Sequence, residues 1–418
     1  MNLKGIFRKS FRETKKWYLH MILLHMILIY LMQKKSRHYI FLKLCSYLSK
    51  VNMKTVFYYQ AEFYFFYAEY KKALNYIDLF LEKYPLNIDG KLLKIQLLYL
   101  LGDKTKALYE LEKIQQESNR LKIWMLMSKL VDTKIDLKNM EKLYLKYIEK
   151  KRNISTKIEI QKYISSAAAS IEAYDIAEHY LKNSLKLHEK FSLKNTKKKY
   201  FSKYDALIAL EDLSSVFNSL NIKFFLVSGT FLGCIRENNF ISNDYDIDVG
   251  VWEEDFSNEL KIALEQYGTF YIHDPKWKGG IKLKHINGIL IDIFVHYKDG
   301  CKHYHLGSAV KWYNSTFDLI KYDFLGKEYF GFKEYDRYLS ENYGDWRIPK
   351  KNFDNILDTP NAVIFNENNF ILHLYSLLMK QYAIDYKNTI LDLLKKYKFR
   401  EDKNVFFVLL YLWSMVIS

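Results

Sequence analysis

The sequence predicts a helical-hairpin repeat domain followed by a mixed α/β sheet with flanking helices. Four prolines and fifteen glycines interrupt 418 residues, and so few breakers are typical of long helices. Residues 55–190 are self-similar, whereas short apolar runs rich in β-forming residues begin only near residue 222. We therefore predict four segments: N-terminal helices in 1–54, helical repeats in 55–195, a sheet domain in 200–360 and C-terminal helices in 361–418.

Composition allows large cores and excludes extended disorder, because 49% of the residues are hydrophobic and 17% are aromatic. The net charge of +16 suits nucleic acid, anionic lipid or an anionic substrate, and equally a lysine-rich solvated surface. Cys45, Cys234 and Cys301 form neither a disulfide framework nor a Cys-x-x-Cys pair. This cysteine usage favours a reducing compartment, so we expect a cytoplasmic protein.

An apolar run near the N-terminus, residues 17–32, contains sixteen uncharged residues between two pairs of lysines. A spanning helix needs roughly 20 apolar residues, and the run lacks the small-residue cleavage site of a signal peptide. Our first interpretation is a buried helix that caps the next domain. The alternative is an interfacial helix that rests on an anionic membrane. A shorter apolar run at residues 405–417 is predicted to be a docked helix.

The repeats are read from small residues at a fixed period. Ala73 and Ala107 are 34 residues apart, and Ala177 follows seventy residues later, close to two further periods. Pro85 ends the first copy, whereas the copy around residues 136–147 is degenerate. This pattern resembles the tetratricopeptide repeat, in which a small residue lets two helices approach closely. Either the repeats bind a partner protein, or they are a scaffold for the second half.

The sheet domain begins with a predicted helix over 203–220, a strand over 222–227 and a turn at Ser228 and Gly229. A second helix starts at Thr230. A glycine at a strand-to-helix turn lets a phosphate approach the backbone N–H groups of the helix N-terminus.

Acidic residues then mark two predicted strands. Asp244, Asp246 and Asp248 alternate with apolar residues, so all three would share one face of a strand. Three carboxylates on one face repel one another unless a hard cation such as Mg²⁺ binds them. Asp292 interrupts a strongly apolar strand over 288–296 and needs a partner there. The Asp246/Asp248 pair with a cation would supply one; the alternative is an outward-facing acid on an edge strand.

Four motifs in this order resemble the LicD/fukutin family of the nucleotidyltransferase fold. They are SGTFLGCIRENNF, the acidic run NDYDIDVG, the strand IDIF, and YGDW followed by Pro349. The resemblance covers roughly residues 205–360, and Asn243 replaces the tryptophan that often precedes the acidic run in the family. It implies a nucleotidyltransferase-fold mixed sheet with flanking helices.

The resemblance also implies a role for each matching residue. Asp246 and Asp248 would bind a divalent metal, Mg²⁺ or Mn²⁺, and Asp292 would be a third metal ligand or a base. Residues that would bind the donor phosphates are Ser228, Gly229, Thr230, Arg236 and Lys282. Residues expected around the substrate pocket are Asp244, Trp312, Asn314, Tyr343, Asp345 and Trp346. The alternatives are a solvated Lys282, a structural turn at 343–346, and ordinary core positions for Trp312 and Asn314.

The implied reaction is the transfer of a phospho-alcohol. The donor would be a CDP-activated alcohol such as choline, ribitol or glycerol, and the acceptor a hydroxyl of a bacterial-type capsule, lipo-oligosaccharide or teichoic acid. In-line attack would release a nucleoside monophosphate. We expect the enzyme in the cytoplasm, resting on the inner face of the membrane near a lipid-linked glycan.

Two other functions start from the same residues. A nucleotidyltransferase that acts on RNA would use the same glycine turn, arginine and paired aspartates, and the positive charge would suit RNA. The YGDW segment and the GTFLG wording favour the LicD-like reading, so we do not expect nucleic acid as a partner. A non-catalytic tetratricopeptide adaptor is the second alternative, and the presence of Asp246, Asp248 and Asp292 argues against it.

Another group of residues, near the end of the predicted sheet domain's acidic strands, has the alternating spacing of a zinc site. Cys301, His303 and His305 would face one side of a strand, with His296 nearby. No second pair of ligands completes the site. We therefore expect these histidines on the surface or in contact with the acceptor.

Overall fold

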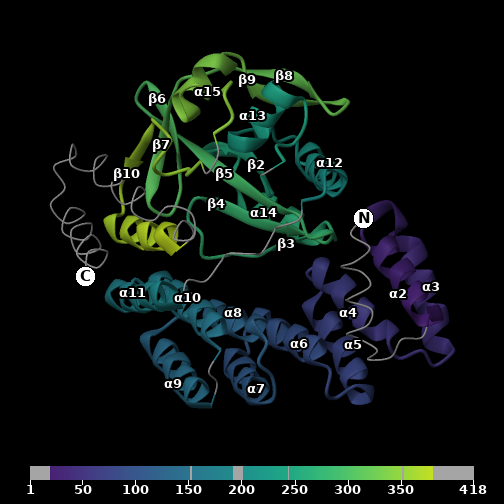
Figure 1. The fold of residues 1–418 in the computed structure, drawn as a ribbon. Helices are drawn as coiled ribbons and strands as arrows, with labels where there is room; N and C mark the ends of the chain where they lie inside the picture. Colours follow the sequence, from purple (N-terminus) through teal and green to yellow (C-terminus); the bar gives the residue numbers. More distant parts are fainter. Residues whose placement is uncertain (1–18, 151–152, 192–200, 243, 351–352, 380–418) are drawn as a thin grey trace. The chain divides into compact units, whose positions relative to one another are not determined.

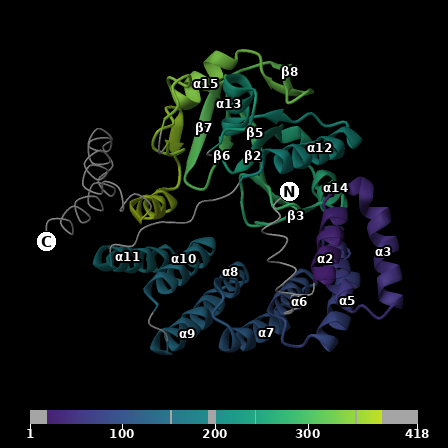
Figure 2. The ribbon, with the colours of Figure 1, turned by 45° about the vertical axis from the view of Figure 1, so that its right-hand side comes forward.

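A computed structural model describes residues 19–150, 153–191, 201–242, 244–350 and 353–379 (Figures 1 and 2). The chain forms two compact units. The first comprises residues 1–110 and 199–363, and the second comprises 111–198 and 364–418. The predicted segment boundaries differ from this division, because the helices up to residue 110 group with the sheet.

The first unit begins with short helices that pack around an aromatic core. They are α2 (Leu19–Met32), the 3-10 helix η1 (Lys35–Arg37), α3 (His38–Lys50), α4 (Val56–Phe66), α5 (Tyr70–Lys83) and α6 (Ile88–Leu100). Helix α4 is buried on nearly every side, since α2, α3, α5 and α6 all contact it. Phe41 and Phe63 stack with their ring centroids 4.9 Å apart in this core. Large aromatic side chains thus fix the arrangement of these helices.

The described part of the N-terminal apolar run is α2. Leu28, Ile29 and Met32 are buried in the aromatic core, so the expectation of a buried helix holds for one face. Within the described ranges, no helix combines the length and the apolar character needed to cross a membrane. The predicted helix at residues 405–417 lies outside the described residues.

The second unit is helical. It contains the later half of α7 (Lys104–Glu117), then α8 (Leu121–Lys129), α9 (Lys134–Lys150), α10 (Ile154–Ser170), α11 (Tyr174–Phe191) and a helix over residues 367–379. Trp124 is buried between Tyr144 and Tyr147. The Tyr375 hydroxyl donates a hydrogen bond to Glu178 Oε1 at 3.1 Å, which joins the last described helix to α11.

The small residues of the predicted repeats are all completely buried. Ala73, Ala107 and Ala177 have no exposed surface, and each lies in the second helix of a successive pair. This burial is what close approach of paired helices requires. The assignment to the tetratricopeptide repeat, and a partner protein on its surface, stay predictions.

The first unit continues into a mixed sheet, as the sequence predicted. Its strands are β1 (Phe225–Leu226), β2 (Asp246–Trp252), β3 (Phe270–Ile272), β4 (Gly280–His285), β5 (Leu290–Asp299), β6 (Lys302–Leu306), β7 (Val310–Ser315), β8 (Leu319–Phe324), β9 (Lys327–Phe332) and β10 (Ala362–Ile364). Their order is β10-β7-β6-β5-β2-β1-β9-β8, and β4 joins β3 to β5. The pairs β2/β5 and β1/β9 are parallel, whereas β1/β2 and β4/β5 are antiparallel.

Four helices flank the sheet: α12 (Lys203–Ser219), α13 (Ser228–Glu237), α14 (Asn258–Gln266) and α15 (Tyr335–Tyr343). A second 3-10 helix, η2 (Glu253–Asp255), follows β2. Helix α12 starts where the Ser202 side chain accepts a hydrogen bond from the Asp205 N–H at 3.2 Å, as an N-cap does. Its buried residues Leu210, Leu213 and Phe217 lie in the core of the sheet domain. This helix was predicted from the same apolar spacing.

Two predicted strands are shorter in the structure. Strand β1 covers only Phe225–Leu226 of the predicted 222–227, and α13 begins at Ser228. Strand β2 begins at Asp246, where pairing with β5 begins. The placement of Asp244 in this strand was wrong, because its N–H bonds to the Ile241 carbonyl at 3.1 Å in a turn.

Candidate active site

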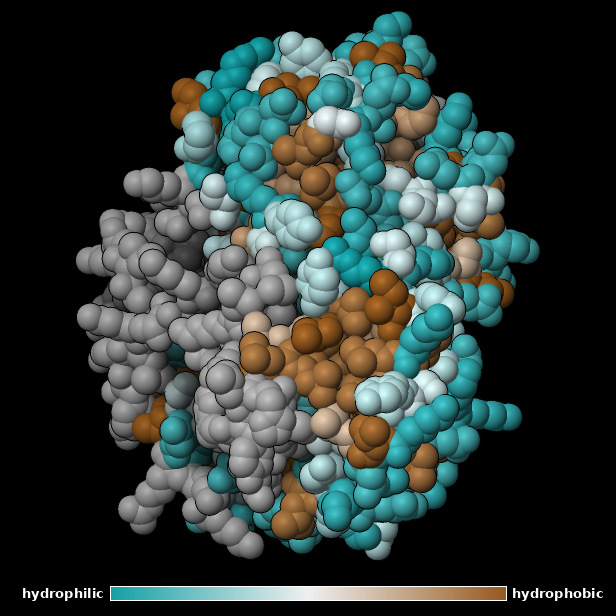
Figure 3. All heavy atoms as spheres, turned by 90° about the vertical axis from the view of Figure 1, so that its right-hand side faces the viewer, coloured by the Kyte–Doolittle hydropathy of each residue, from teal (hydrophilic) through white to brown (hydrophobic). Residues whose placement is uncertain are grey.

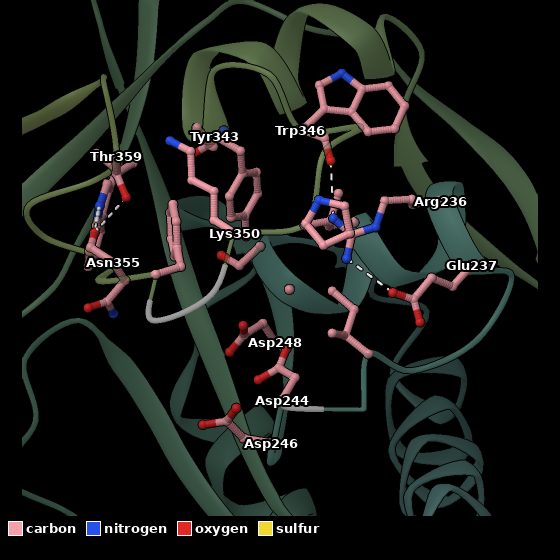
Figure 4. Close-up of a pocket in the computed structure, with 18 of the residues that line it drawn as sticks. Arg236, Glu237, Asp244, Asp246, Asp248, Tyr343, Trp346, Lys350, Asn355 and Thr359 are labelled. Carbon is pink, nitrogen blue, oxygen red and sulfur yellow. Dashed lines mark hydrogen bonds and ion pairs between the residues drawn. The ribbon is translucent and has the colours of Figure 1, made fainter. Parts of the chain in front are cut away.

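A pocket of about 1060 Å³ lies beside the N-terminus of α13 and the start of β2 (Figure 4). The predicted site residues that line it are Ser228, Gly229, Arg236, Asp244, Asp246, Asp248, Asp292, Trp312, Tyr343, Asp345 and Trp346. Three other predicted site residues do not line it: Thr230, Lys282 and Asn314. In Figure 4 the three carboxylates of Asp244, Asp246 and Asp248 gather on one side, away from Tyr343 and Trp346.

The acidic cluster consists of Asp244, Asp246 and Asp248. The last two alternate with Ile247 and Val249, which are completely buried in the core, so the aspartates face the pocket as predicted. Asp244 reaches the cluster from the preceding turn. Each of the three offers an oxygen within 4.8 Å of the others, and the described residues contain no other such group of three or more potential metal ligands.

The cluster crowds negative charge around Asp248. Burial raises the pKa of this carboxyl well above its usual range, and the neighbouring carboxylates of Asp246 and Asp244 raise it further. The Gly229 backbone N–H donates a hydrogen bond to Asp248 and opposes the shift. Carboxylate oxygens alone make up the donor set, which is the chemistry that Mg²⁺ and Mn²⁺ prefer. The residues present therefore fit the predicted divalent cation.

Asp292 is neutralised differently. The parallel register sets it opposite Asp248, and the antiparallel register sets it opposite Lys282 on β4. Lys282 Nζ lies 3.2 Å from Asp292 Oδ2, whereas Asp292 is not part of the acidic cluster. Burial raises the pKa of Asp292, and the Lys282 ammonium opposes that shift. Lys282 thus pairs with Asp292, where the sequence had suggested contact with the donor phosphate.

The turn into α13 is shaped by close contacts. A Cβ on Gly229 would lie 2.0 Å from Asp244 Oδ2, so only glycine fits here without displacing the cluster. Ser228 has φ of +48°, which is uncommon for a residue with a side chain, and its N–H donates to the Tyr338 hydroxyl at 3.1 Å. Thr230 is buried, and its hydroxyl accepts a hydrogen bond from the Asp248 N–H at 2.8 Å. Thr230 therefore holds β2 against α13 and does not face the pocket.

Arg236 joins α13 to the YGDW segment. Its Nη1 donates to the Trp346 carbonyl at 3.1 Å, and its Nη2 lies 3.0 Å from Glu237 Oε1. Its Nε is buried and has no hydrogen-bond partner among the described residues. The Trp346 ring is fixed in turn by a hydrogen bond of 3.0 Å from its Nε1 to Asp336 Oδ1. The guanidinium thus connects α13 to the Trp346 backbone and positions this wall of the pocket.

Another part of the pocket lining is aromatic. The His305 ring stacks on Trp312 with centroids 5.0 Å apart, and it lies 5.0 Å from the Phe294 ring. Trp312 Nε1 donates to the Asn355 carbonyl at 3.0 Å. Complete burial lowers the pKa of His305 to about 3, so this imidazole is neutral at ordinary pH. We call Phe294, His305, Trp312 and Phe353 the aromatic wall, since all four line the pocket.

Sequence reasoning missed Phe294 and Phe353 as site residues. Phe294 follows Asp292 by two positions on β5, so strand alternation could have placed both on the pocket side. Phe353 has no such signal, since it reaches the pocket from a segment that follows α15.

The predictions for two neighbouring positions on β7 had different outcomes. Trp312 lines the pocket, whereas the buried Asn314 donates to Glu341 Oε2 at 3.0 Å and helps fix α15. The zinc alternative is not formed within the described ranges. Cys301 is exposed, and His303 packs against Trp252 with centroids 4.9 Å apart.

Comparison with known proteins identifies the family that the sequence motifs resembled, for the part of the chain that contains the acidic cluster. Residues 221–335 match the family LicD/FKTN/FKRP, nucleotidyltransferase domain. The chain is 27% identical over 163 residues to ribitol-5-phosphate transferase FKTN of Macaca fascicularis and 26% identical over the same length to that of Homo sapiens. It is 24% identical over 197 residues to an uncharacterised protein of Rickettsia typhi.

These matches cover part of each protein. Each match to the two transferases covers 37% of this chain and 35% of the relative, and the Rickettsia typhi match covers 44% and 53%. The family match contains the α13 turn, the acidic cluster and Asp292, whereas the YGDW segment and Phe353 lie beyond it. Residues 221–335 therefore match the nucleotidyltransferase domain of the LicD/FKTN/FKRP family, and the predicted resemblance to the LicD/fukutin family is confirmed for these residues.

Proposed function

We propose that this protein is a phosphotransferase that moves a phospho-alcohol from a CDP-activated donor to a hydroxyl of a cell-surface glycan. The main support for the proposal is the acidic cluster at the N-terminus of α13. It lies in a pocket whose lining also includes the aromatic wall. The relatives named as ribitol-5-phosphate transferases support this reaction class.

The acidic part of the pocket would bind the diphosphate of the donor. A divalent cation held by Asp244, Asp246 and Asp248 would supply positive charge beside the diphosphate and stabilise the leaving nucleotide. The Arg236 guanidinium, which also lines the pocket, would add positive charge beside the diphosphate. Because Gly229 carries no side chain, the Asp244 carboxylate can lie against the α13 turn and stay in the cluster that would hold the cation.

Asp292 is suited to act as the base. Burial raises its pKa, which brings a carboxylate closer to the range that efficient general bases need. Lys282 keeps it oriented and in its charged form through the contact of 3.2 Å. The acceptor oxygen would form the new bond to the phosphorus that carries the alcohol. The bond from that phosphorus to CMP would break, and the hydroxyl proton would pass to Asp292.

The aromatic wall would receive the acceptor. Flat rings bind the apolar faces of sugars, and the neutral His305 adds a polar edge without charge. The pocket volume of about 1060 Å³ is large enough for a donor and a sugar together.

The test is nucleotide release by the full-length protein. It is incubated with Mg²⁺, a glycan extract and one of CDP-ribitol, CDP-choline or CDP-glycerol, with ATP or CTP and RNA in parallel. We expect metal-dependent CMP release from one CDP-alcohol, abolished in Asp246→Asn. The matched control is Asp318→Asn, whose side chain is 79% exposed and outside the pocket.

Two outcomes contradict the proposal. Pyrophosphate release from ATP or CTP with RNA, and no reaction of the CDP-alcohols, would identify an RNA nucleotidyltransferase. Equal CMP release by the wild type and Asp246→Asn would show that the acidic cluster is not the site.

A further inference from the structure

We propose that α2 and α3 form a docking surface for an anionic lipid bilayer. Helix α2 consists almost entirely of apolar residues, and such a helix is normally buried all round. Here it exposes half of Leu23 (50%) and Ile27 (49%), and 42% of Tyr30. Spacings of four and three residues place these side chains on one face, opposite the face that enters the aromatic core.

Helix α3 and the residue after it extend the same surface. Tyr39 is 67% exposed, Ile40 54%, Tyr47 64% and Val51 54%. Figure 3 shows the side of the molecule on which α2 and α3 lie in Figure 1, and apolar atoms there form one broad patch. Contiguous apolar patches of this kind mark interaction sites, whereas scattered exposed leucines do not.

The charge around this patch identifies the partner as anionic. The sequence between residues 14 and 61 contains eight lysines and arginines and no acidic residue. The Arg37 guanidinium lies 3.8 Å from the centre of the Tyr30 ring, and Lys43 Nζ lies 4.6 Å from that of Tyr39. Tyrosines flanked by cations suit the headgroup layer, where the ring stays among apolar chains and the cation reaches lipid phosphate.

The same charge disfavours the other occupants. A second copy of the chain would bring two positive patches together, which like charges oppose. A nucleic acid would use the cations but leave the leucine and isoleucine side chains without a partner. An anionic bilayer satisfies both the apolar and the basic parts of the surface.

The dimensions indicate a helix that lies in the interface. The described part of α2 has 14 residues, or about 21 Å of helix, against a hydrocarbon core of about 30 Å. A helix too short to span the bilayer can instead place its exposed apolar face in the headgroup boundary, and the basic residues around it make such binding respond to anionic lipid. This surface is formed by elements of the first unit alone and does not depend on the proposed reaction.

Vesicle flotation of the full-length protein tests the proposal. One set of vesicles contains phosphatidylcholine alone, and the other contains phosphatidylcholine mixed with phosphatidylglycerol. We expect stronger binding to the anionic vesicles, weakened by salt. Leu23→Gln with Ile27→Gln should reduce that binding by at least about tenfold. The matched control is Ile135→Gln with Leu145→Gln on α9, whose side chains are 73% and 53% exposed, and it should bind as the wild type does.

A second double variant removes positive charge at exposed positions, so that loss of vesicle binding can be separated from loss of folding. Lys43→Glu with Lys50→Glu changes two exposed residues, so the unfolding temperature should stay unchanged while binding to anionic vesicles falls. Asp246→Asn should bind vesicles normally, which separates docking from catalysis. The proposal is overturned if the wild type binds no anionic vesicles or if both double variants bind as the wild type does. A wild-type dimer that the Leu23/Ile27 variant splits, without vesicle binding, would instead identify a second copy as the partner.

Discussion

Two parts of the pocket lining, the acidic cluster and the aromatic wall, differ in the charge that they carry. At the acidic cluster, Asp246 and Asp248 lie beside a third aspartate, and burial together with mutual repulsion raises the pKa of Asp248. At the aromatic wall, the only ionisable group is His305, and burial keeps it neutral. The acidic cluster therefore concentrates negative charge that a cation would balance, whereas the aromatic wall carries no net charge.

A second contrast lies within the acidic part of the pocket. Asp248 and Asp292 are opposite each other on β2 and β5, yet only Asp292 has a lysine at 3.2 Å. Lys282 balances the charge of Asp292 within the protein, whereas we propose that a cation balances the charge of the cluster. From this difference we expect the cluster carboxylates to bind the metal and the Asp292 carboxylate to accept a proton.

The largest expected effect comes from Asp248→Asn. Removing one carboxylate from the cluster should lower CMP release by about a thousandfold, because both cation binding and charge stabilisation are lost. The same change should raise the unfolding temperature in EDTA, since it removes repulsion at a buried position. Enzyme assays and thermal unfolding measure the two effects, and a lower unfolding temperature would contradict the electrostatic account.

Gly229→Ala should have the next largest effect. The new Cβ would lie 2.0 Å from Asp244 Oδ2, so Asp244 must move away from the cluster. We expect activity at limiting Mg²⁺ to fall by about a hundredfold, with partial recovery at saturating Mg²⁺ because Asp246 and Asp248 stay in place. A Mg²⁺ titration of the reaction rate measures this shift. An unchanged Mg²⁺ requirement would exclude Asp244 as a ligand.

Changes in the aromatic wall should alter binding more than the chemical step. Trp312→Leu removes the stacking face, and we expect KM for the glycan to rise by about tenfold with little change in kcat. Trp312→Phe keeps a ring but loses the hydrogen bond to the Asn355 carbonyl. Its KM for the glycan should therefore lie between that of the wild type and that of Trp312→Leu. A fall in kcat with unchanged KM for both variants would place the acceptor elsewhere.

The smallest expected effect is on stability against pH. The folded-state pKa of His305, about 3, lies below its usual value of 6.5, so the unfolded chain binds more protons between these values. Stability should therefore fall as the pH drops below about 6.5, by at most about 1.4 kcal/mol per pH unit for one histidine. Between pH 6.5 and pH 3, the free energy of unfolding of His305→Phe should fall less than that of the wild type. Denaturant unfolding at several pH values measures the difference, and parallel curves would show that His305 is not buried as neutral imidazole.

Local patterns predicted the parts of the site that lie close together in sequence. The period of two placed Asp246 and Asp248 on one face of β2, and apolar spacing predicted α12. The pattern failed at Asp244, because a run of alternating residues does not reveal where strand pairing begins.

Contacts between distant segments could not be predicted in this way. The ion pair of Lys282 with Asp292 depends on the register of β4 against β5, which sequence periodicity leaves open. Trp312 and Asn314 share one face of β7, yet Glu341 of α15 binds only Asn314 of the two, so their roles diverge. The aromatic wall likewise combines residues from β5, β6, β7 and the segment after α15.

Binding of Mn²⁺ followed by electron paramagnetic resonance tests the central contrast most directly. Mn²⁺ is added to the wild type, to Asp246→Asn and to Asp292→Asn, and the free ion is counted. We expect Asp246→Asn to weaken binding by at least about tenfold, because it removes one of three charged oxygen ligands. Asp292→Asn should change the affinity much less, since Lys282 already pairs with that carboxylate. Equal Mn²⁺ affinity in the wild type and Asp246→Asn would contradict the account.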